Sequence, residues 1–177
     1  MLAVASVTIL TACDQANPSI EDQMSSLGLP MDALLNVNAE TRVTLHMNAD
    51  PELLIFVPGH FGGWEPHATL GERPTVDGGK MGDSYSLGPW NDEQRQYDPG
   101  YCYLFGANQG PIKKISVGTS EAKWKIVNPA IGGWVIVVPE SVGTEALEWQ
   151  LIGPDGASVF EHAGSDAPPR VGDRCAH

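Results

Sequence analysis

The chain is divided into short apolar segments by glycine- and proline-rich turns, and this rhythm constrains its fold more than any other feature. It contains 20 Gly and 14 Pro in 177 residues, and no segment keeps a helical period for more than about ten residues. Residues 42–48 alternate polar and apolar side chains, which predicts a strand with one face on a core. Residues 52–57 form a continuous apolar run that ends at Pro58-Gly59, which predicts a strand buried on both faces.

Similar short segments recur along the rest of the chain. Further strands are predicted at 101–105, 112–117, 122–127, 134–138, 147–152 and 158–162. The turn Gly153-Pro154-Asp155-Gly156 joins the last two as the clearest hairpin. This spacing predicts one mainly β domain over residues 29–177, which is an antiparallel β-sandwich or, alternatively, a β-barrel.

Residues 58–100 do not follow this pattern of short strands and turns, because they contain only one plausible strand, at 84–87. Loops of more than about 15 residues inside a compact domain tend to be functional or disordered. Aromatic residues throughout the segment favour packing over disorder; they are Phe61, Trp64, Tyr85, Trp90 and Tyr97. We therefore expect one long ordered loop excursion across an end of the sandwich.

The start of this excursion combines polar and aromatic side chains that suit recognition. A possible binding surface consists of His60, Trp64, Glu65, His67 and Trp90. The three other tryptophans lie within predicted strands, where large aromatic residues usually pack in a core.

An enzymatic alternative uses His60 or His67. The glycine-rich turn after the strand at 52–57 is similar to the oxyanion loop of α/β-hydrolases, which offers backbone N–H groups to a developing oxyanion. The nucleophile motif Gly-x-Ser-x-Gly is missing, and the nearest strings, 82–86 and 117–120, do not fit it.

A metal site is a second enzymatic alternative. His60, Glu65 and His67 are weak candidate ligands for zinc or copper, and a further ligand would have to come from His46 or His162. No complete ligand pattern is visible, and residues 77–83 lack the alternating oxygen ligands and the terminal Glu of a calcium loop. We predict no metal and no cofactor.

The charge excludes one class of partner. The chain carries 22 acidic and 10 basic residues, for a net charge of -12. Nucleic-acid binding requires clustered Lys and Arg that displace counterions from phosphates. We therefore expect no nucleic-acid partner.

The N-terminal residues indicate where the protein is located. Residues 2–12 are uncharged and mostly apolar, and Leu10-Thr11-Ala12-Cys13 resembles the lipobox of bacterial lipoproteins. The resemblance implies that residues 1–12 are a signal peptide, that cleavage follows Ala12 and that Cys13 carries the lipid. Residues 13–28 would then be the lipidated cysteine and a polar, flexible tether. The apolar run is about half of what a membrane span requires, so the lipid would hold the protein in the bacterial cell envelope, facing the periplasm or the cell exterior.

The cysteine count agrees with this predicted location in the cell envelope. If Cys13 carries lipid, Cys102 and Cys175 remain as a pair. We predict a disulfide between them, which requires an oxidising compartment; the alternative is two free thiols in a reducing one. Together these features predict a noncatalytic binding or structural role through residues 58–100, with an envelope protein or a glycan as the partner.

Overall fold

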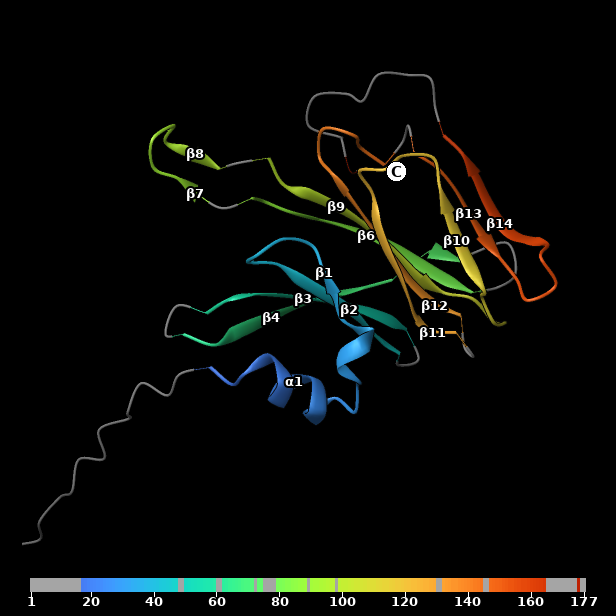
Figure 1. Cartoon of the computed structure of the whole chain (residues 1–177), viewed down its shortest axis with the longest axis horizontal. Helices are drawn as coiled ribbons and strands as arrows, with labels where there is room; N and C mark the ends of the chain where they lie inside the picture. Colours follow the sequence, from blue (N-terminus) through green and yellow to red (C-terminus); the bar gives the residue numbers. More distant parts are fainter. Residues whose placement is uncertain are drawn as a thin grey trace, which may run out of the picture.

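Three antiparallel sheets and one short helix are stacked as four layers (Figure 1). The computed structural model describes residues 17–47, 50–59, 62–71, 73–74, 79–88, 90–97, 99–129, 132–144, 147–164 and 175. Within them the fold is mainly β, as predicted, and the strands close into no barrel.

The helix-side sheet has the strand order β1-β2-β3-β4. Its strands are β1 (Leu35–Asn36), β2 (Arg42–Met47), β3 (Pro51–Pro58) and β4 (Trp64–Leu70). Strand β3 is buried on both faces, as its apolar run predicts: Leu53 and Ile55 pack toward the central sheet, whereas Leu54 and Phe56 pack toward the helix α1 (Ile20–Ser26).

The central sheet has the order β11-β12-β9-β6-β5. Its strands are β5 (Arg73–Pro74), β6 (Lys80–Ser86), β9 (Tyr101–Ala107), β11 (Lys123–Asn128) and β12 (Gly133–Pro139). Alternate residues of β9 serve two cores, because Tyr103 and Phe105 face the helix-side sheet while Cys102 and Leu104 face the third sheet. The predicted sandwich is therefore confirmed, and the structure adds a further layer to it.

The outer sheet has the order β10-β13-β14 and covers the second face of the central sheet. Its strands are β10 (Lys114–Val117), β13 (Glu148–Ile152) and β14 (Ser158–Ala163). The predicted hairpin joins β13 to β14, and the N–H of Gly153 donates to the carbonyl of Ala157 across its turn. Trp149 packs between Trp134 and Phe160, with ring centroids 4.9 and 4.7 Å away.

Residues 58–100 contain more regular structure than the expected loop excursion. They supply β4, β5 and β6, and they supply a small ribbon of β7 (Trp90–Asn91) and β8 (Gln96–Tyr97) that ends a long hairpin (Figure 1). Strand β4 lacks an apolar alternation and contains Pro66, which an edge strand tolerates because the missing N–H faces no neighbour. Strand β6 is longer than the predicted 84–87 and lies inside the central sheet, between β9 and β5.

Residues 13–28 were expected to form a flexible tether, but residues 17–28 contain a helix that packs on the domain. The side chain of Ser19 accepts a hydrogen bond from the N–H of Asp22 and so caps α1. Ile20 and Met24 are buried against β3 and against the short 3-10 helix η1 (Met31–Ala33). Two apolar residues four positions apart are enough to dock this otherwise polar segment.

The predicted disulfide is present. Cys102 and Cys175 are bonded, with their Cα atoms 5.4 Å apart. Among the described residues no helix has the length and apolar character needed to cross a bilayer. Residues 1–16, which include the expected signal peptide and Cys13, lie outside the described residues.

Candidate binding groove on the outer sheet

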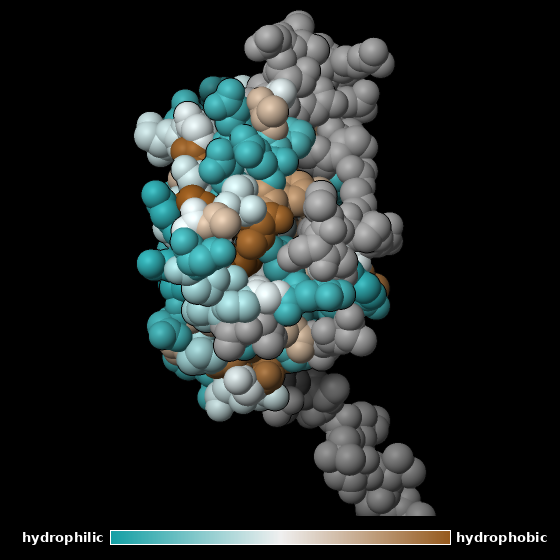
Figure 2. All heavy atoms as spheres, turned by 90° about the vertical axis from the view of Figure 1, so that its right-hand side faces the viewer, coloured by the Kyte–Doolittle hydropathy of each residue, from teal (hydrophilic) through white to brown (hydrophobic). Residues whose placement is uncertain are grey.

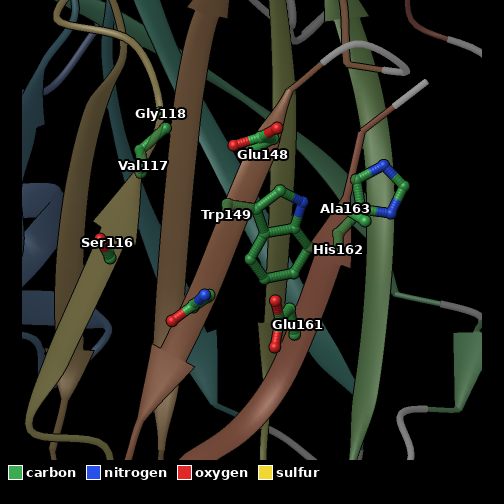
Figure 3. Close-up of a pocket in the computed structure, with 9 residues that line it drawn as sticks. Ser116, Val117, Gly118, Glu148, Trp149, Glu161, His162 and Ala163 are labelled. Carbon is green, nitrogen blue, oxygen red and sulfur yellow. The ribbon is translucent and has the colours of Figure 1, made fainter. Parts of the chain in front are cut away.

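A shallow groove of about 240 Å³ lies on the outer sheet. Residues from all three strands and from the bend after β10 line it; they are Ser116, Val117, Gly118, Glu148, Trp149, Gln150, Glu161, His162 and Ala163. Figure 3 shows its polar side chains spread across the strands rather than gathered at one point.

The register of the sheet explains why polar side chains meet there. Ser116 pairs with Gln150, and Gln150 pairs with Glu161, so these three residues form one row across β10, β13 and β14. Because side chains alternate between faces, the neighbouring row of Val117, Trp149 and His162 points toward the core instead. Trp149 is only 3% exposed.

The groove is acidic. The segment from Leu147 to Gly164 carries the carboxylates Glu148, Asp155 and Glu161 and contains no Lys or Arg. Glu148 and Glu161 are both exposed on its rim. Figure 2 shows the surrounding face as mainly hydrophilic, with a small hydrophobic area near its centre. Carboxylates, an amide and a hydroxyl suit a ligand that donates hydrogen bonds or carries positive charge.

A second hollow of about 290 Å³ continues from the end of the groove. It shares Gly118 and Glu148 with the groove and is otherwise lined by Thr119, Val142 and Leu147. The N–H of Gly118 donates to the carbonyl of Glu148 over 2.8 Å, which fixes the bend between the two hollows.

Two residues of the predicted binding surface hold the N-terminal segment instead. The N–H of Trp64 donates to the carbonyl of Pro18, and its own carbonyl accepts from the side chain of Gln23 over 2.7 Å. Oε1 of Glu65 accepts from the side chain of Asn17 over 3.0 Å. The ring of Trp64 packs against the α1 cluster. These contacts dock α1 onto the β3–β4 hairpin.

The structure describes the side chain of only one of the other three predicted residues. His67 is exposed on β4. His60 lies outside the described residues, as does the side chain of Trp90. The two hollows described on the outer sheet are both lined by residues outside 58–100.

The described residues do not bring together a set of catalytic or metal-binding side chains for either enzymatic alternative. The hydroxyl of Ser84 lies 3.4 Å from that of Thr69, and no hydrogen bond among the described residues joins Ser84 or Ser120 to His67. In the same part of the chain, no group of three or more His, Cys, Asp or Glu side chains is placed to hold a metal. The suggested extra ligands lie in different layers: His46 on β2, 3.4 Å from Glu52, and His162 on β14.

The residues of the groove were missed by sequence reasoning. Glu148 and Gln150 alternate with Trp149 and Leu151, which is the ordinary pattern of a strand with one solvated face. The absence of any Lys or Arg over 147–164 is the one signal that sets β13 and β14 apart, while the neighbouring β10 begins with the exposed Lys114.

No protein-family model matches this chain, and no curated protein or solved structure is significantly similar to it.

Proposed function

We propose that this chain is a lipid-anchored protein of the bacterial envelope and that its β domain is a noncatalytic binding domain that uses the outer-sheet groove. The observation that carries the proposal is the order of the layers. Helix α1 lies at one end of the stack and the outer sheet at the other, with two sheets between them (Figure 1).

The anchor would set the orientation of this stack. Ile20, the first residue of α1, is the seventh residue after Cys13. Seven residues span at most about 25 Å when fully extended. A lipid on Cys13 would therefore keep α1 close to the membrane and leave the outer sheet as the layer farthest from it.

The disulfide supports the same compartment. A bond between Cys102 and Cys175 persists in an oxidising environment such as the periplasm or the cell surface. The acidic groove supports binding, because its exposed polar side chains occupy a concave surface.

The anchor is tested by Cys13→Ser. The natural protein should incorporate radiolabelled palmitate and sediment with membranes, whereas the variant should do neither. Unchanged labelling and fractionation of the variant would overturn the anchor.

The orientation is tested with single cysteines and a membrane-impermeant maleimide applied to spheroplasts. Gln150→Cys lies in the groove, and Ser26→Cys, on the exposed side of α1, is its matched control. Gln150→Cys should react equally in the anchored protein and in the protein released by protease from the membrane, while Ser26→Cys should react more slowly in the anchored one. Labelling of Gln150→Cys only after cell lysis would overturn the proposed location.

A further inference from the structure

The outer edge of strand β14 adds a specific binding mode to this groove. Strand β14 is the last strand of its sheet, and no described strand pairs with its outer edge (Figure 1). Every second residue of an edge strand directs its N–H and C=O groups away from the neighbouring strand. Such an edge accepts an extended peptide as an additional strand.

We propose that the outer sheet binds an extended basic peptide segment of a partner protein, which pairs with the edge of β14 and places its basic side chains over the acidic groove. The inference rests on the proposed binding role of the groove and names the chemistry of its ligand. Charge complementarity selects this occupant, because the residues that line the groove include the carboxylates Glu148 and Glu161 and no Lys or Arg.

The pleat of β14 sets the pattern of the ligand. Glu161 and Ala163 lie on the exposed face, and His162 lies between them on the core face. A ligand residue opposite Glu161 would place its Cβ about 4.5 to 5.5 Å from that of Glu161, close enough for an ion pair. The first basic position of the ligand is therefore the one that faces Glu161.

A second basic position follows two residues along the ligand. It lies opposite Ala163, whose small side chain leaves the exposed face open. Glu148 is the cross-strand partner of Ala163 on β13. A Lys or Arg at this position would extend across Ala163 toward the carboxylate of Glu148.

The ligand residue between the two basic ones points to the core side. There it meets the half-buried side chains of Phe160 and His162, which already pack on Trp149 with ring centroids 4.7 and 6.3 Å away. An apolar side chain fits this position because it extends the existing core cluster. The motif is thus basic, apolar, basic in an extended conformation.

The test uses the full-length protein purified in detergent and the peptide acetyl-Lys-Val-Lys-Val-Lys-amide, with binding measured by calorimetry. The control peptide acetyl-Lys-Lys-Val-Val-Lys-amide has the same composition and charge, but no two of its Lys residues are two positions apart. We expect the alternating peptide to bind about tenfold more tightly, since only this peptide has basic side chains two residues apart on one face of a strand. Equal affinity of the two peptides would overturn strand addition.

Two variants locate the site. Ala163→Lys puts a positive charge on the proposed path, and Ala157→Lys puts the same charge on the exposed turn at the far end of the hairpin. Ala163→Lys should weaken binding about tenfold, whereas Ala157→Lys should change it less than about twofold, because exposed charges are screened beyond about 10 Å. Equal effects of the two variants would show mere attraction by net charge and would overturn the proposal. The maleimide labelling of Gln150→Cys does not depend on these peptides, so it decides the proposed location separately.

Discussion

The Cα atoms of Cys102 and Cys175 lie 5.4 Å apart, and their disulfide joins positions that are 73 residues apart in the sequence. Cys102 is fully buried in β9, where it pairs with Val138 on one side and with Tyr85 on the other. The bond therefore fixes residue 175 to the middle of the central sheet.

Reduction of this bond should destabilise the domain. In the chain-entropy model a loop of this length contributes on the order of 4 kcal/mol. Urea-induced unfolding with and without dithiothreitol should show a loss of that order for the natural protein. Cys175→Ser should lower the stability similarly and should make it insensitive to dithiothreitol. Two titratable thiols in native protein isolated from the envelope would contradict the bond.

Tyr103 should make the domain sensitive to alkaline pH. Burial raises the pKa of Tyr103 from 10.0 to about 12, and the hydrogen bond of 2.6 Å with Ser86 offsets this only partly. Between pH 10 and 12 the unfolded chain loses the phenolic proton while the folded protein retains it. Ionisation then stabilises the unfolded chain, so the free energy of unfolding should fall over this range by about 2 to 3 kcal/mol.

The measurement is urea unfolding at several pH values, together with ultraviolet titration of the tyrosines. Tyr103→Phe should remove most of the decrease between pH 10 and 12. Tyr85→Phe is the control, because Tyr85 is 42% exposed and donates to Glu140 at the surface. An equal decrease in natural protein and Tyr103→Phe would show that another group is responsible.

Helix α1 should behave as part of the folded domain. Met24 is fully buried between α1 and β3, and Met24→Ala should lower the free energy of unfolding by about 2 to 5 kcal/mol. Ser25→Ala, at the exposed neighbouring position, should change it by less than about 0.5 kcal/mol. Rapid proteolysis after residue 20 in the natural protein would contradict the docking of α1.

The strands that could be predicted from the sequence are those whose hydrophobic pattern is visible in their own residues, without knowledge of the strands that they pair with. Residues 42–48 alternate because Val43 and Leu45 of β2 face the central sheet; the other face was expected to be solvated, but Thr44 is fully buried there and donates to the carbonyl of Ala33. Residues 52–57 are continuously apolar because β3 is covered by the central sheet and by α1. The hairpin at Gly153–Gly156 is equally local, since its turn chemistry lies in four consecutive residues.

What could not be predicted depends on contacts distant in sequence. Helix α1 spans less than two turns, and only the pocket formed by β3 and η1 makes Ile20 and Met24 core residues. Strand β4 forms because it pairs with β3 along its whole length, although Pro66 and His67 give its sequence no strand pattern. The groove arises where β10 pairs with β13 and so aligns Ser116 with Gln150 and Glu161 of the predicted hairpin, and only this pairing with β10 is distant in sequence.

Trp64 illustrates how a residue predicted to bind a ligand can instead stabilise the fold. The guanidinium carbon of Arg42 lies 4.4 Å from the centroid of the Trp64 ring. Arg42 and Trp64 are both partly buried, so a contact of this type contributes about 0.5 to 2 kcal/mol. A double-mutant cycle with Arg42→Met and Trp64→Leu should give a coupling energy of that size in urea unfolding.

Trp124, which is 44% exposed on β11, supplies the matched control, and Trp124→Leu should be additive with Arg42→Met within about 0.3 to 0.5 kcal/mol. Strict additivity of the Arg42 and Trp64 variants would return Trp64 to the candidates for ligand contact.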